Sequence, residues 1–183
     1  MCIDYFESLE RNPDLEPDLS ANTTRVLGIL NTEYAEAWTS KGSHWVAFAI
    51  DLPTRHQKLR VTVYDSLAPT PESTKARVAK VAERLAKTSV AEQTRTAVMR
   101  TIHKGIHEPP SPHKNTKVHK VEQANGPRQK DGSSCGVYAL AYMLHVARTN
   151  EVDMRPSEII PIDDIRHQIA RSILKQRRVF GNA

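Results

Sequence analysis

A cysteine set between small residues opens a long apolar run near the C-terminal third of the chain. Cys135 lies between Ser134 and Gly136, and the residues after it repeat their apolar side chains at helical spacing: Val137, Leu140, Ala141 and Leu144. This pattern predicts a buried helix of roughly three to four turns that begins at or near Cys135. A helix N-terminus lowers the pKa of a thiol from its usual value of roughly 8.5. The segment therefore predicts a nucleophile held at the start of a helix.

Two upstream segments supply a base and an acid. Residues 44–50 and 59–65 alternate large apolar residues with small or polar ones, which is typical of β-strands. His44 opens the first segment and Asp65 closes the second, so they are candidates for the base and for the carboxylate that orients it. Asp51 is a possible substitute for Asp65. With Cys135, these residues predict acyl-transfer chemistry by a thiolate.

Gln129 and Trp45 complete the candidate site. Gln129 precedes Cys135 by six residues, and its side-chain amide can donate to an oxyanion together with the backbone N–H of Cys135. Gln123 is the weaker candidate for that role. Trp45 follows His44 directly, and its flat indole beside small residues favours a narrow, glycine-ended substrate tail.

These segments, taken in chain order, resemble a known family. His44-Trp45, then Tyr64-Asp65-Ser66, then Gln129-x-x-Gly-x-x-Cys135-Gly resembles the ubiquitin-like protein proteases, whose best-known members are the SUMO (sentrin-specific) proteases. The stretch 44–50 is also distantly similar to the adenovirus protease. The resemblance implies an α+β, papain-like cysteine protease fold, with a central mixed or antiparallel sheet flanked by helices and the cysteine at a helix N-terminus.

The same resemblance implies the function. His44, Asp65 and Cys135 would form the triad, Gln129 would bind the oxyanion, and Trp45 would contact the Gly-Gly tail of the substrate. The chain would hydrolyse the peptide or isopeptide bond after the C-terminal Gly-Gly of a ubiquitin-like modifier, SUMO above all, through an acyl-enzyme. The expected partner is the modifier or its conjugates, and neither a cofactor nor a metal is needed.

Two departures from the family pattern leave alternatives open. Ser134 stands where many members carry an Asp, and no Trp-Leu-x-Asp motif is recognisable in the 43 residues before His44. The N-terminal part is therefore expected to be shortened relative to the family. The alternatives are an inactive module of the same fold that only binds a modifier, and a Cys-His-acid acetyltransferase of the bacterial effector type.

Length and charge fit a single catalytic domain over residues 1–183 with a basic insertion at 71–120. The chain is 39% hydrophobic, and residues 71–130 hold 13 Lys and Arg against 5 Asp and Glu. A solvated helix face is the ordinary explanation for such a band, and nucleic-acid binding is the minority one. Further helices are expected near residues 25–37, around 78–86 and at 165–174, and a short strand at 117–123.

The expected location is intracellular, in the nucleus or cytoplasm. The sequence has no apolar run of about 18 residues and no secretory signal, so no membrane partner is expected. Its two cysteines, Cys2 and Cys135, are too few for a stapled secreted scaffold and suit a reducing compartment. We expect a monomer.

Overall fold

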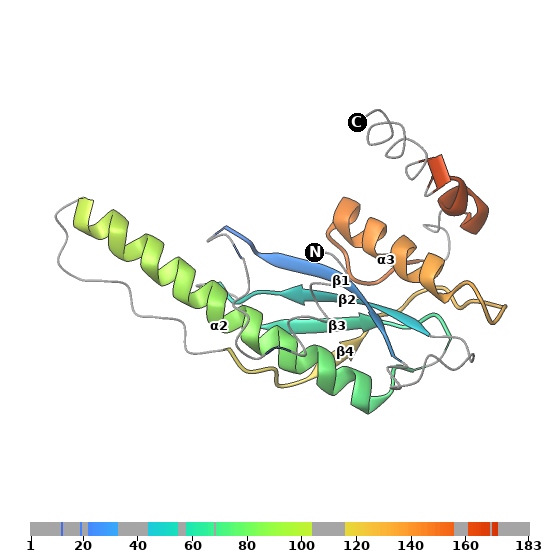
Figure 1. Cartoon of the computed structure of the whole chain (residues 1–183), viewed down its shortest axis with the longest axis horizontal. Helices are drawn as coiled ribbons and strands as arrows, with labels where there is room; N and C mark the ends of the chain where they lie inside the picture. The colour runs from blue at the N-terminus through green and yellow to red at the C-terminus, as the bar shows by residue number, and fades with distance from the viewer. Residues whose placement is uncertain are drawn as a thin grey trace.

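The computed structural model describes residues 12, 19, 22–32, 44–54, 58–67, 69–103, 116–155, 161–168 and 170–171. A four-stranded sheet with the strand order β1-β2-β3-β4 lies at the centre, with one long helix on either face (Figure 1). The elements, in chain order, are β1 (Arg25–Asn31), β2 (Trp45–Asp51), β3 (Arg60–Tyr64), α2 (Glu72–His103), β4 (Val121–Gln123) and α3 (Cys135–Thr149).

The sheet is mixed. β2 pairs antiparallel with both β1 and β3, whereas β4 runs parallel to β3. The parallel pair requires a crossover, and α2 provides it. This confirms the α+β class with a central mixed sheet flanked by helices.

The two faces of the sheet pack against different helices. On β2, Val46, Phe48 and Ile50 belong to the cluster that contains the α2 residues, whereas Ala47 and Ala49 belong to the cluster that contains the α3 residues. Because successive side chains of a strand point to opposite faces, one strand serves both clusters. The small alanines leave α3 room to approach the sheet closely.

The prediction of a helix near residues 25–37 is wrong for residues 25–31, which form strand β1. Its side chains alternate between buried and half-buried along the whole strand, as a sheet requires. Both faces carry apolar residues, so the sequence V-L-G-I-L hides the alternation. Gly28 also makes a helix less favourable, because glycine has a low helix propensity. In the sheet it lies across from Phe48 in β2. Residues 33–37 lie outside the described residues.

The other expected elements are found with different bounds. The pattern at 78–86 is part of α2, which runs from Glu72 to His103 and fills most of the expected insertion. The expected strand at 117–123 begins only at Val121. A helical segment begins at residue 162, earlier than the expected helix at 165–174. Within the expected range, residues 165–168, 170 and 171 are helical, and the remainder lies outside the described residues.

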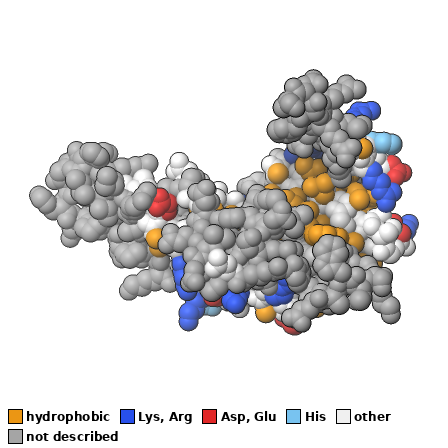
Figure 2. Space-filling model, in the orientation of Figure 1, with side chains coloured by type: hydrophobic (Ala, Val, Ile, Leu, Met, Phe, Trp, Pro, Cys, Tyr) orange, Lys and Arg blue, Asp and Glu red, His pale blue; other side chains and the backbone are white. Residues whose placement is uncertain are grey.

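Helix α3 is apolar around most of its circumference. Hydrophobic side chains gather over it in the view of Figure 2. Its buried side includes Ala139, Tyr142 and Val146, and Leu140 and Leu144 are half-buried. Such a helix is typical of a protein interior. In the part of the chain that the structure describes, no helix is long and apolar enough to cross a membrane.

Candidate active site

Cys135 is the first residue of α3, as the sequence predicts. It is 6% exposed, and Ser134 is the residue that precedes the helix. The backbone N–H groups of Val137 and Tyr138 both donate to the carbonyl of Ser134 at 3.0 Å. The thiol is therefore carried by a well-formed first turn, at the helix end where the macrodipole favours negative charge.

The structure joins His44 to Asp65. Nε2 of His44 lies 2.8 Å from Oδ1 of Asp65, and the two side chains are 16% and 2% exposed. The carbonyl of His44 accepts a hydrogen bond from the N–H of Thr32 at 2.8 Å, which fixes the backbone just before β2. Nδ1 of His44 is buried and has no hydrogen-bond partner among the described residues. One ring nitrogen thus faces the acid while the other remains available.

Asp65 is held by its own loop. Its Oδ1 also accepts the N–H of Leu67 at 2.9 Å, and its backbone carbonyl accepts Nη1 of Arg128 at 2.8 Å. These bonds leave the carboxylate little freedom to turn away from the imidazole of His44. The Arg128 contact also ties the loop after β3 to the segment that leads to Cys135.

Gln129 strengthens this link between the two segments. Its N–H donates to the carbonyl of Ser66 at 2.9 Å, and its Oε1 accepts the hydroxyl of Ser66 at 2.6 Å. Its Nε2 donates to the carbonyl of Asp131 at 2.5 Å. The side chain is 8% exposed and held at both ends, so its amide has a fixed direction.

Trp45 brings the start of β2 next to the start of α3. A Cβ built on Gly136 would lie 3.6 Å from Cδ1 of Trp45, which is ordinary van der Waals contact. The indole therefore lies against the residue that follows Cys135. Trp45 also packs against the cluster that contains Tyr64 and Tyr142.

The two substitute residues lie elsewhere. Gln123 pairs with Val63, and its Oε1 accepts the N–H of Thr70 at 3.0 Å. In a parallel pair these neighbours share a face, and Val63 belongs to the α2 cluster, so Gln123 points to the face opposite α3.

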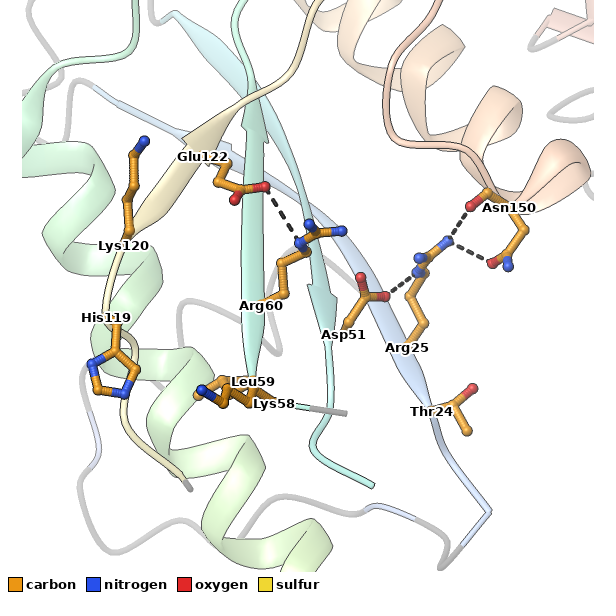
Figure 3. Close-up of a pocket in the computed structure, with 10 residues that line it drawn as sticks. All are labelled: Thr24, Arg25, Asp51, Lys58, Leu59, Arg60, His119, Lys120, Glu122 and Asn150. Atoms are coloured by element: carbon orange, nitrogen blue, oxygen red, sulfur yellow. Dashed lines mark hydrogen bonds and ion pairs between the residues drawn. The ribbon is translucent and has the colours of Figure 1, made fainter. Parts of the chain in front are cut away.

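Asp51 ends β2, at the far end of the strand from His44, and forms an ion pair with Arg25. It lines an open groove of about 870 Å³, in which Arg60 faces Glu122 (Figure 3). Apart from Asp51, none of the residues predicted for the site lines this groove. Its lining residues are Thr24, Arg25, Asp51, Lys58, Leu59, Arg60, His119, Lys120, Glu122 and Asn150.

Asp131 and Arg166 were missed by the sequence reasoning, and both contact the residue before Cys135. The carboxylate of Asp131 accepts the N–H groups of Ser133 and Ser134 at 2.8 and 2.7 Å. It also accepts the hydroxyl of Ser134 at 2.8 Å, and these bonds hold the pKa of Asp131 below its ordinary value, the Ser133 N–H having the largest effect. The only sequence signal for these contacts was Ser134, which stands where many members of the family carry an Asp.

Several histidines invite a metal hypothesis, and His56, His107 and His113 among them lie outside the described residues. Within the residues that the structure describes, no group of three His, Cys, Asp or Glu side chains could hold a metal ion. His145 is 7% exposed, and its Nε2 lies 3.1 Å from the carbonyl of Asp153, so it is a packed side chain of α3.

A helix that begins at a cysteine and packs on a mixed sheet, with a His–Asp pair at one end of that sheet, defines a papain-like α+β fold. The model of the "Ulp1 protease family, C-terminal catalytic domain" matches residues 29–178. The chain therefore belongs to the Ulp1 protease family. No curated protein matches the sequence.

Solved structures of SUMO protease Ulp1 share the fold. The form with the catalytic cysteine oxidised to a sulfonic acid has a TM-score of 0.52 and 16% identity, and the match covers 92% of this chain and 60% of that one. The sulfenic acid form has a TM-score of 0.50 and 18% identity, covering 84% and 53%. The Xanthomonas campestris effector protein XopD bound to ubiquitin gives 0.43 and 17%, covering 79% and 60%. The matched part is thus 53 to 60% of these relatives' length.

Proposed function

We propose that the chain is a cysteine peptidase that cleaves the peptide or isopeptide bond after the C-terminal Gly-Gly of a ubiquitin-like modifier. One observation carries the proposal. The His44 ring bonds to the buried Asp65 through Nε2 at 2.8 Å, while its buried Nδ1 has no partner among the described residues. That is the state expected of a base that is oriented on one side and open to a thiol on the other.

In the proposed mechanism, Nδ1 of His44 takes the proton of the Cys135 thiol, and Asp65 stabilises the imidazolium that results. The thiolate attacks the carbonyl carbon of the scissile bond. His44 then protonates the departing amine, and a water molecule later hydrolyses the thioester. Each step uses side chains that belong to this chain.

Gln129 is the proposed oxyanion donor, together with the backbone N–H of Cys135. A primary amide carries two N–H donors, and only one is needed for the bond to the Asp131 carbonyl. The second N–H can therefore serve the developing oxyanion. Each such donor contributes about 3 kcal/mol to lowering the barrier.

The contact between Trp45 and Gly136 supports a glycine-ended substrate. The indole lies within van der Waals range of the residue that follows the thiol, and a flat wall at this place favours a tail without branched side chains. The family, whose structural relatives include SUMO proteases, makes SUMO the first modifier to test. The single catalytic domain over residues 1–183, the monomeric state and the nuclear or cytoplasmic location remain predictions from the sequence.

The test is a panel of modifiers, SUMO and ubiquitin among them, each carrying a C-terminal propargylamide that reacts with a catalytic thiol. We expect the SUMO probe to form a covalent adduct with the wild type and none with Cys135→Ala. The same modifiers without the electrophile control for binding alone.

Three other outcomes contradict the proposal, each in a distinct way. A modifier that binds without an adduct favours the inactive binding module. Acetyl transfer from acetyl-CoA without any adduct favours the acetyltransferase alternative. An adduct that persists in Cys135→Ala places the nucleophile elsewhere.

A further inference from the structure

Two charged side chains converge on Ser134, the residue that precedes the nucleophile. The Ser134 hydroxyl donates to Oδ2 of Asp131 at 2.8 Å and accepts a hydrogen bond from Nη2 of Arg166 at 2.7 Å. Ser134 is 1% exposed. A buried hydroxyl with one donor and one acceptor bond to charged groups is held in a fixed orientation, since bonds to ionised groups are the stronger kind.

The position of Ser134 makes this orientation unusual. It is the N-cap of α3, where a serine hydroxyl ordinarily accepts a bond from an N–H of the first helical turn. In this chain the side chain makes no such bond. The hydroxyl is turned instead toward Asp131 and Arg166, so it links the loop before the helix to a distant part of the chain.

Asp131 fixes the loop from its other side. Besides the Ser134 hydroxyl, its carboxylate accepts the N–H groups of Ser133 and Ser134. The loop backbone between Gln129 and Cys135 is thus gathered around one carboxylate. The Ser134 hydroxyl also receives a hydrogen bond from outside this loop, from Arg166.

Arg166 reaches the loop from the helical segment at 162–168. Ile165, its neighbour, is fully buried and anchors that segment, and Nη1 of Arg166 bonds to Asp163 at 3.2 Å. The Arg166 side chain is half exposed, yet one of its nitrogens contacts the hydroxyl of the nearly fully buried Ser134. It therefore places a permanent positive charge beside the residue that precedes α3, and the carboxylate of Asp131 bonds to the same hydroxyl.

We propose that Arg166 is a positioning residue for Cys135, which it serves in two ways. Through Ser134 it holds the first turn of α3 in place, and it brings a positive charge to the residue that precedes the thiol. The inference rests on the proposed function in one respect, because it takes Cys135 as the nucleophile.

The test measures the rate of alkylation of Cys135 by iodoacetamide across pH, in a Cys2→Ser background so that one thiol reacts. Arg166→Gln keeps a side chain that can donate to Ser134 but removes the charge. We expect its rate of alkylation at neutral pH to fall by up to about tenfold and its profile to move to higher pH. Arg166→Lys, which keeps the charge, should lie between this variant and the wild type.

The matched control is Arg171→Gln, which removes an exposed charge from the same C-terminal region. It should alkylate like the wild type. If Arg166→Gln gives the same profile as this control, the inference is wrong. It is equally wrong if Arg166→Gln lowers only the melting temperature, because that would make the contact merely structural. Alkylation reports on the thiol without any modifier, so failure of this test and failure of the adduct panel can be told apart.

Discussion

Tyr64 and Tyr142 stack face to face, with ring centroids 4.7 Å apart and ring planes within 5°. Tyr64 is the last residue of β3 and precedes Asp65, whereas Tyr142 lies on α3, the helix that begins at Cys135. The stack thus connects the strand that presents the acid to the helix that presents the thiol. Gly126 also passes close to the Tyr64 ring, where a Cβ would clash.

The hydroxyls of this pair should differ in their contribution to stability. The Tyr64 hydroxyl donates to the carbonyl of Pro127 at 2.5 Å, whereas the buried Tyr142 hydroxyl has no partner among the described residues. Burial raises the pKa of both phenols, so both stay neutral. Tyr64→Phe should cost about 1 kcal/mol in the free energy of unfolding, and Tyr142→Phe should be neutral or stabilising. Urea denaturation of both variants checks this, and equal losses would contradict it.

Substitutions at Asp65 and Asp51 test which of the two carboxylates is the acid of the proposed triad. Asp65→Asn keeps the shape of the side chain but removes the carboxylate that faces Nε2 of His44. We expect kcat on a modifier substrate to fall by about 10³- to 10⁴-fold. Asp51→Asn breaks only the ion pair with Arg25 at the other end of β2 and should retain activity. Steady-state kinetics decide, and a larger loss in Asp51→Asn would reverse the assignment.

The sequence predicted the parts of the fold in which one physical signal dominates. The apolar spacing after Cys135 reflects a helix whose buried side is continuous, and α3 begins at that residue. On β2 the alternation of large residues and alanines reports which face meets which helix. The strand β1 was missed because both of its faces are apolar, which leaves no alternation to detect.

The contacts around the thiol could not be predicted in the same way. Ser134, Asp131 and Arg166 meet only because the C-terminal helical segment returns to the loop before α3, over a separation of 32 residues from Ser134 to Arg166. No local pattern encodes such a meeting. The choice between Asp65 and Asp51 likewise depended on which end of the sheet each acid occupies.

The roles of Gln129 and Gln123 can be told apart by comparing the activities of their alanine variants. Gln129→Ala removes the proposed oxyanion donor, and kcat should fall by about 10²- to 10³-fold with the substrate KM little changed. Gln123→Ala removes a side chain that bonds to Thr70 on the other face of the sheet, so it should leave kcat near the wild-type value. A KM effect without a kcat effect in Gln129→Ala would indicate a binding role instead.

Gly28 should tolerate no side chain. It lies across from Phe48, and a Cβ at this position would overlap the buried Phe48 ring. Because the ring is enclosed by the core, Gly28→Ala should lower the free energy of unfolding by about 1–3 kcal/mol. Gly132→Ala is the control, since a Cβ there meets nothing within 4 Å, and it should change stability by no more than about 0.5 kcal/mol. Similar losses in the two variants would show that Phe48 can move aside.

Asp131 should make the stability of the protein depend on pH. Its hydrogen bonds to Ser133 and Ser134 lower its pKa in the folded state, so the unfolded chain binds a proton more readily. The stabilisation is therefore complete above the unfolded pKa of about 4 and is lost as the pH falls through the lower, folded value. Asp131→Asn should melt below the wild type at pH 7, and the difference should shrink as the pH falls toward about 3. Asp164→Asn, at an exposed position, should show no such trend, and a gap for Asp131→Asn that stays constant with pH would mean that the charge of the carboxylate contributes nothing.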